Sequence, residues 1–97
     1  MELLSEFEEK EKKQILEIAK TRFTKAQVYE LKIEYKNAIK YYEEAARLDP
    51  DSILYLNDAG TMFFKLANYD KTIEFFDKAL KSDLKTFGLE YPKIATG

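Results

Sequence analysis

Residues 34–49 read EYKNAIKYYEEAARLD, and residues 68–83 read NYDKTIEFFDKALKSD. When the second stretch is laid over the first with a shift of thirty-four residues, aromatic, aliphatic and small positions largely coincide. The positions identical in both copies are Tyr35 and Tyr69, Ile39 and Ile73, Ala45 and Ala79, and Asp49 and Asp83. One register that holds across both stretches indicates an internal repeat, in which each unit is a supersecondary element that stacks on the next.

Each repeat unit is predicted to contain two helices joined by a short turn. In Tyr35–Leu48 the apolar side chains recur every three or four residues, which fits one face of a helix and not the alternation of a strand. Pro50 ends that helix, because proline lacks an N–H and disfavours a helical residue before it. Ser52 is the predicted N-cap of the next helix, Ile53–Leu66. The last complete helix is predicted to cover Tyr69–Ser82.

This arrangement resembles the tetratricopeptide repeat, whose signature has a small residue and an aromatic in the first helix and alanine, aromatic and alanine in the second. The matching positions are Ala26, Tyr29, Ala38, Tyr42, Ala45 and Pro50, then Gly60, Phe63, Thr72, Phe76 and Ala79. The departures are Arg22, Lys25, Ala59 and Leu84. The resemblance implies an all-α fold of antiparallel helix-turn-helix repeats stacked as a short right-handed α-solenoid. The four signature aromatics are expected to fill the space between helices.

On this register the chain divides into four parts. They are a charged helical extension at residues 1–18, a first repeat at 19–52, a second repeat at 53–86, and a linker with the truncated start of a third repeat at 87–97. The last part resembles the extended inter-repeat loop of kinesin-light-chain-like repeats, in which a proline opens the following helix. Pro92 suits that place, because the first turn of a helix does not need its missing N–H.

The extension at residues 1–18 does not continue the repeat. Its apolar residues have helical spacing on either side of a charged centre, EEKEKKQ at residues 8–14. No proline or glycine interrupts residues 2–32, so one long helix is one interpretation, with the pairs Glu8–Lys12 and Glu9–Lys13 stabilising its centre. A frayed, charged arm is the alternative.

Composition argues against several classes of function. The 97 residues carry a formal net charge of −2, and the pI of about 5.2 is unlike that of a nucleic-acid-binding protein. The chain has no cysteine and no histidine, which removes thiolate chemistry and the commonest metal ligand. No apolar run approaches the ~20 residues of a membrane helix, and the first residues do not read as a signal peptide. The sequence therefore predicts a cytoplasmic protein that is not an enzyme and needs no cofactor, metal, nucleic acid or membrane.

In the family that this sequence resembles, the first helix of each pair lines a concave groove that holds a peptide. By position, the groove residues are Lys20, Phe23, Gln27, Leu54, Asn57, Asp58, Thr61, Phe64 and Lys65, with Thr24, Glu30 and Leu31 beside them. The polar members can hydrogen-bond a ligand backbone, and the aromatic and leucine side chains can anchor apolar groups. The alternative is that the aromatics pack against neighbouring helices and the polar groups are solvated.

Some members of the family clamp a terminal carboxylate of a heat-shock chaperone with lysine and asparagine side chains. Here Phe23 and Gln27 stand at the positions of the first lysine and asparagine, and Asp58 stands where a second asparagine belongs. A carboxylate at Asp58 would repel such a ligand, so the clamp is not expected. The leading hypothesis is an interaction scaffold that binds a peptide or a partner helix in the groove.

Self-association is the second hypothesis. Each repeat buries its apolar face against the next one, so the last helix of a short array exposes apolar side chains that another copy can cover. The residues expected to take part are Leu4, Phe7, Ile73, Phe76 and Leu80. Docking of the amino-terminal extension, or of an equivalent helix from another copy, onto the last helix would bury several large side chains, and docking between copies would produce a homo-oligomer.

Overall fold

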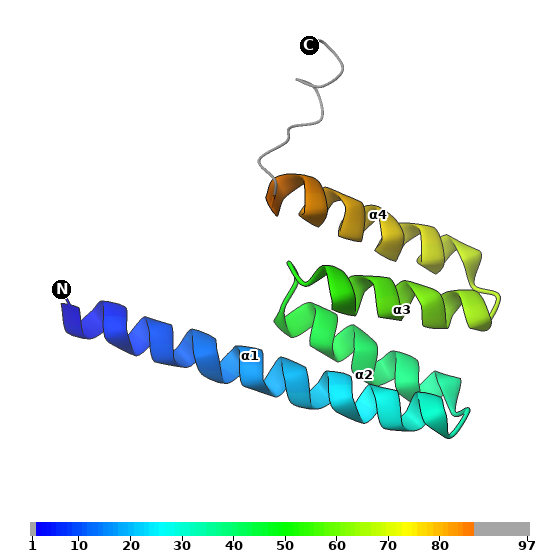
Figure 1. Ribbon diagram of the computed structural model, residues 1–97, viewed down its shortest axis with the longest axis horizontal. Coiled ribbons are helices and arrows are strands. Elements are labelled where there is room, and N and C mark those ends of the chain that lie inside the picture. Colours follow the sequence, from blue (N-terminus) through cyan, green and yellow to red (C-terminus); the bar gives the residue numbers. More distant parts are fainter. Residues whose placement is uncertain (1, 87–97) are drawn as a thin grey trace, which may run out of the picture.

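Four α-helices make up residues 2–86, which are the residues that the computed structural model describes. They are α1 (Glu2–Leu31), α2 (Tyr35–Leu48), α3 (Ile53–Lys65) and α4 (Tyr69–Thr86). Figure 1 shows them stacked in chain order, each antiparallel to the one before, with α1 and α4 as the outer layers. No strand occurs in this part of the chain. Two helix pairs stacked in this way confirm the predicted α-solenoid fold class.

The turns inside the two helix pairs have the same backbone geometry. In each turn one residue has a positive φ, 62° at Ile33 and 61° at Ala67. The N–H of the residue that follows donates to the carbonyl five residues back, at 2.9 Å in both turns. This is the Schellman motif, which usually places glycine at the left-handed position. A β-branched side chain is strained there, and the side chain of Ile33 is 72% exposed, so packing does not offset the strain.

The loop between the pairs ends α2 and begins α3 as predicted. Asp49 is the C-cap of α2, and its N–H still donates to the carbonyl of Ala45. Ser52 is the N-cap of α3, and its hydroxyl oxygen accepts a hydrogen bond from the N–H of Tyr55 at 3.3 Å. Pro50 lies between the two caps, where it interrupts no helical hydrogen bond.

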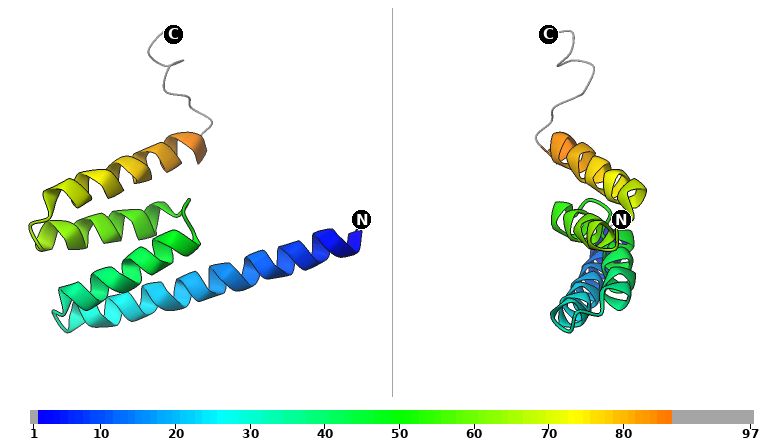
Figure 2. Two further views of the ribbon diagram at one scale, coloured as in Figure 1. Left: turned by 180° about the vertical axis from the view of Figure 1, so that it is seen from behind. Right: turned by 90° about the vertical axis from the view of Figure 1, so that its right-hand side faces the viewer.

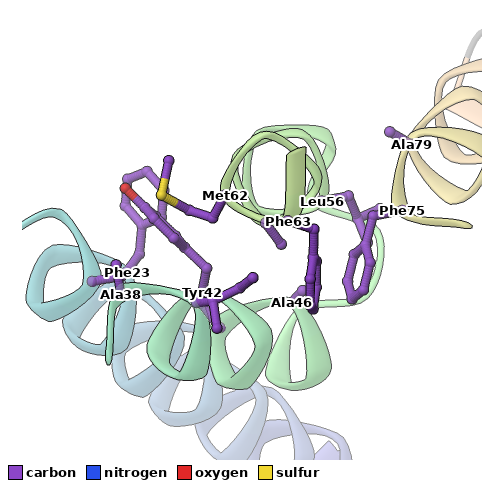
Figure 3. Close-up of a cluster of buried hydrophobic side chains, with 13 residues drawn as sticks. Phe23, Ala38, Tyr42, Ala46, Leu56, Met62, Phe63, Phe75 and Ala79 are labelled. Atoms are coloured by element: carbon purple, nitrogen blue, oxygen red, sulfur yellow. The ribbon is translucent and has the colours of Figure 1, made fainter. Parts of the chain in front are cut away.

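The core is built around α2, which packs against α1 on one side and α3 on the other. Ala38 and Ala45 have no exposed surface, so the neighbouring helices approach α2 closely at these positions. Tyr42 and Met62 are the largest fully buried side chains, and Figure 3 shows them beside Phe23 of α1. Burial of each such side chain stabilises the fold by about 1.5–3 kcal/mol.

Helix α4 is longer than the sequence predicts. It continues to Thr86 and does not end at Ser82. Leu84 stands where the family usually has a proline, so nothing in this sequence stops the helix there. The hydroxyl of Ser82 also donates to the backbone carbonyl of Asp51 at 2.8 Å, which ties the last turns of α4 to the loop between the helix pairs.

Phe75, which the sequence did not single out, packs between α3 and α4 together with one side of Phe76. Phe75 is 7% exposed and its ring centroid lies 5.4 Å from that of Phe63, whereas Phe76 is 41% exposed. Phe76 lies against the backbone of Gly60, where an added Cβ would stand 2.6 Å from its ring. The prediction for Phe76 is therefore partly right, because one side of its ring packs on Gly60 of α3 whereas the other side is exposed within residues 2–86.

Residues 3–18 of α1, which we call the arm, extend beyond the rest of the stack (Figure 2). Every side chain of the arm is exposed, and the first buried residue of α1 is Ala19. The structure thus supports one continuous helix, but the predicted pairs Glu8–Lys12 and Glu9–Lys13 do not form. Among residues 2–86 no ion pair involves the arm, because water competes well for exposed charges. The predicted kinesin-light-chain-like segment at 87–97 lies outside the described residues.

Candidate functional site

One face of α3 carries a row of exposed side chains, Leu54, Asn57, Thr61 and Phe64, which we call the α3 strip. Its members recur every three or four residues, so they lie above one another along the helix. The hydroxyl of Thr61 donates to the backbone carbonyl of Asn57 at 2.9 Å, but the Asn57 side-chain amide has no hydrogen-bond partner among residues 2–86. Phe64 is 57% exposed and meets Tyr69 edge to face at 5.5 Å. The α3 strip thus offers apolar groups at both ends and an amide between them.

The predicted groove residues of α1 divide into exposed and buried ones. Lys20 and Gln27 are exposed. Phe23 is 9% exposed, because Tyr42 of α2 and Tyr55 of α3 lie against it, with ring centroids at 5.5 and 4.8 Å. Phe23 is therefore a core residue that joins three helices. Its assignment as an apolar anchor for a ligand is wrong, and the packing alternative is right at this position.

A cluster around Glu30 links α1 to α3 next to the α3 strip. The hydroxyl of Tyr42 donates to Glu30 Oε1 at 2.6 Å, and Lys65 Nζ lies 3.4 Å from Glu30 Oε2. Lys65 also lies over the ring of Tyr35, 5.1 Å from its centroid. Burial raises the pKa of the Tyr42 phenol well above its usual value, and the hydrogen bond to Glu30 raises it further, so the phenol remains a donor at neutral pH.

The sequence placed Glu30 beside the groove but did not predict its contacts with Tyr42 and Lys65. Glu30 and Lys65 are 35 residues apart, close to one repeat length, so stacking of the two pairs brings the end of α1 to the end of α3. That spacing, with opposite charges at its two ends, was the available signal. The cluster provides a direct contact between the end of α1 and the end of α3.

Asp58 makes the middle of this face acidic. It is half-buried, and burial raises the pKa of its carboxyl group, with a further contribution from the charge of Glu30. The partial burial of Asp58 and the negative charge of Glu30 both make a second negative charge beside Asp58 unfavourable. A ligand that presents a carboxylate at this point is therefore disfavoured, in line with the departures from the chaperone clamp.

The residues predicted for self-association are all exposed but lie in two separate places. Ile73, Phe76 and Leu80 are 67%, 41% and 48% exposed and follow Tyr69 along α4, in a row that we call the α4 stripe. Leu4 and Phe7 lie on the arm. Since α1 and α4 are opposite outer layers of the stack in Figure 1, the arm and the α4 stripe of one chain do not meet.

Neither a metal cluster nor a membrane helix is found in the described part of the chain. Residues 2–86 contain no group of three or more acidic side chains placed to hold a metal ion. None of the four helices is both long and apolar enough to span a bilayer. The exposed candidate surfaces described above are the α3 strip, the α4 stripe, and the apolar side chains Leu4 and Phe7 of the arm.

Comparison with known proteins agrees with this architecture. The family model of the tetratricopeptide repeat matches the chain twice, over residues 19–52 and 54–86. The chain is also similar to a protein named Hsp70-Hsp90 organizing protein from Triticum aestivum, with 34% identity over 50 residues. That similarity covers 52% of this chain and 9% of the relative, so this sequence corresponds to a small part of that protein. On the two family matches and the stacked helix pairs, the chain belongs to the tetratricopeptide repeat family, whose repeats are protein–protein interaction modules.

Proposed function

We propose that the two repeats bind a polypeptide segment of another protein along the face formed by α1 and α3. The observation that carries this proposal is the α3 strip, where Leu54 and Phe64 are more than half exposed on either side of Asn57. Large apolar side chains beside a free amide are typical of a surface that anchors side chains and hydrogen-bonds a backbone. The Glu30–Lys65 pair supports it further, since a preformed face loses less entropy on binding.

The chemistry of the face also favours some ligands over others. Asp58 and Glu30 place carboxylates beside the α3 strip, and Lys20 and Lys65 lie at its borders. A segment with apolar side chains and a neutral or basic centre suits this pattern. The similarity to the Hsp70-Hsp90 organizing protein makes chaperone tails worth testing. We expect weak binding of any tail that is held through its terminal carboxylate, because Asp58 repels that group.

The test is to select binding peptides from a display library against the immobilised chain and to measure their affinity by isothermal titration calorimetry. Changing Asn57 and Phe64 together to alanine should weaken binding at least about tenfold, because an exposed anchor and an amide are lost. The circular dichroism spectrum should stay the same, since both side chains are exposed. Lys40→Ala on α2 is the matched control. Loss of binding in the control alone would show that the groove assignment is wrong.

Self-association is a second candidate function, favoured by the α4 stripe. Four apolar side chains at spacings of four, three and four residues form a seam on α4 that another helix can cover. Changing Ile73 and Leu80 together to lysine should then reduce the average mass in sedimentation equilibrium at high protein concentration. Val28→Lys is the control, because it replaces an apolar side chain on α1 that is 45% exposed, close to the 48% of Leu80. A wild-type chain that stays monomeric at millimolar concentration would rule this candidate out.

A further inference from the structure

A cleft of about 580 Å³ lies between α2 and α4, away from the α3 strip and the α4 stripe. Its lining includes the buried apolar side chains of Ala46, Leu56 and Phe75, which are 6%, 4% and 7% exposed. The cleft is larger than the hollow of about 310 Å³ between α3 and α4, which is lined by Asn57 on one side and by Phe76 and Leu80 on the other. Neither the peptide-binding proposal nor the α4 stripe uses it.

The charge of the cleft is opposite to that of the whole chain. Its basic side chains are Arg47, Lys71, Lys78, Lys81 and Lys85, and its carboxylates are Glu43, Asp51 and Glu74. The cleft therefore has a net charge of +2, whereas the chain has −2. A cleft with positive charges above an apolar floor selects an acidic ligand that also carries apolar side chains.

The ion pairs of the cleft compensate its positive charge only in part. Lys81 pairs with Asp77, which lies just outside the lining, at 3.0 Å, and this carboxylate lowers the local net charge to +1. Lys71 and Lys78 share one oxygen of Glu74, at 3.5 and 3.7 Å. Lys85 is 3.9 Å from Asp51, at the limit of an ion pair. Arg47 forms no ion pair with any residue between 2 and 86. Exposed pairs of this kind contribute little and exchange readily for a better partner.

The chain itself contains a segment with the complementary chemistry. Residues 3–9 of the arm, which we call the tip, read LLSEFEE and include three glutamates and no basic residue. Leu3, Leu4 and Phe7 of the tip are 84%, 58% and 59% exposed. None of the tip carboxylates takes part in an ion pair within the described structure. The tip therefore has apolar groups without cover and negative charges without partners.

We propose that the tip of one copy docks into the cleft of a second copy, with its leucine and phenylalanine side chains toward the apolar floor and its glutamates beside the lysines. The contact is between molecules, because α1 is one unbroken helix that runs along α2 and then away from the stack. To reach its own cleft, the arm would have to break that helix. The contact goes beyond peptide binding at the α3 strip, and it gives the self-association candidate a second, electrostatic interface on a different face of α4.

The salt dependence of the mass separates this interface from the α4 stripe. The wild-type chain should exceed its 11.4 kDa monomer mass in sedimentation equilibrium at about 0.1 M NaCl and approach it at about 1 M, because the screening length falls from ~10 to ~3 Å. Association through the apolar α4 stripe would persist at high salt. An average mass that is independent of salt, or that falls to the monomer value in the Ile73→Lys with Leu80→Lys variant, would overturn the proposal.

A charge exchange tests the two partners directly. Glu6→Lys with Glu9→Lys in the tip should raise the dissociation constant about tenfold, and Lys78→Glu with Lys85→Glu in the cleft should do the same. All four changes in one chain should restore association, because a tip with lysines then meets a cleft with glutamates and the two charges are again opposite. The control is Lys36→Glu with Lys40→Glu, which changes the net charge equally on α2 outside the cleft. Helicity measured by circular dichroism checks that each variant folds.

The outcome of the charge exchange is decisive in either direction. The fourfold variant has the same net charge as the wild-type chain, so its recovery supports docking of tip into cleft only together with the control. The Lys36→Glu with Lys40→Glu control has the same net charge as the cleft variant and should still associate, whereas a general effect of net charge would weaken both. Failure of that variant to associate while it remains folded would overturn the proposal. So would a monomeric wild-type chain whose cleft binds poly-glutamate, since the occupant would then be an acidic segment of a different protein. The Asn57→Ala with Phe64→Ala variant should associate normally, which keeps this test separate from that of peptide binding.

Discussion

The hydrogen bond between Tyr42 of α2 and Glu30 of α1 gives the sharpest test of how the two helices of the first pair are held together. Tyr42→Phe removes one oxygen from a side chain that is 1% exposed and otherwise preserves its shape. The hydroxyl donates to a carboxylate at 2.6 Å, and hydrogen bonds to charged groups contribute about 1.5–3 kcal/mol. In the Tyr42→Phe variant the Glu30 carboxylate still pairs with Lys65 at 3.4 Å and is partly exposed to water, so it is not left buried without a partner. We therefore expect a loss of about 1.5 kcal/mol, near the lower limit for such a bond.

For a domain of this size, that loss lowers the melting temperature by about 6–12 °C, which thermal unfolding followed by circular dichroism resolves easily. Tyr41→Phe is the matched control. The Tyr41 ring is stacked on Tyr29 at 5.5 Å, and its hydroxyl has no hydrogen-bond partner in the described part of the chain. The control should change the melting temperature by less than about 2 °C, because only a small polar group is lost.

A double-mutant cycle with Glu30→Ala isolates the interaction itself. If the hydrogen bond is responsible, Tyr42→Phe should cost much less in the Glu30→Ala background, with a coupling energy of about 1 kcal/mol. Equal costs in both backgrounds, or equal effects of Tyr42→Phe and Tyr41→Phe, would refute the reasoning. The hydroxyl of Tyr42 would then not contribute through Glu30.

Three further predictions concern single positions. Ala45→Phe should destabilise the fold by about 1–3 kcal/mol through overpacking, because Ala45 has no exposed surface, and an unchanged melting temperature would place it outside the helix contacts. Ile33→Gly should stabilise it by about 0.5–1 kcal/mol in urea unfolding, since relief of left-handed strain exceeds the entropy that glycine adds to the unfolded chain. In the folded state, burial and then the charge of Glu30 raise the pKa of Asp58 above its usual 3.8. The folded chain therefore holds the proton more tightly than the unfolded chain. Because of this, the free energy of unfolding falls as pH rises from 3.8 through the folded pKa. Asp58→Asn should remove this part of the pH dependence and stabilise the chain at neutral pH. Identical urea midpoints for the wild-type chain and the Asp58→Asn variant, from pH 3.8 to neutral pH, would contradict the assignment.

The sequence by itself determined the repeat, the positions of the helices and the loop between the two pairs, but not the end of α4. A shift of thirty-four residues aligns the two units, and the apolar residues in Tyr35–Leu48 recur with the period of a helix and not with that of a strand. Pro50 and Ser52 fixed the loop between the pairs, because a missing N–H and an N-capping hydroxyl act within a few residues of the chain. The small residues Ala38 and Ala45 were predicted at helix contacts and are buried there. All of these features depend on local geometry or on side-chain size.

Only the tertiary structure decided which side of a helix meets which neighbour. The pattern that placed Phe23 in the groove cannot show that Tyr42 and Tyr55 close over it, because both belong to other helices. Phe75 and Phe76 are equally apolar neighbours in the sequence, and the stacking of α4 on α3 determines which of them is buried. The candidate site divides in the same way. The exposure of Asn57, Thr61 and Phe64 follows from helical spacing, whereas the contact between Glu30 and Lys65 exists only because the two pairs stack with the ends of α1 and α3 side by side. Helical periodicity sets the direction of each side chain about its own axis, but the relative placement of the helices sets its partners.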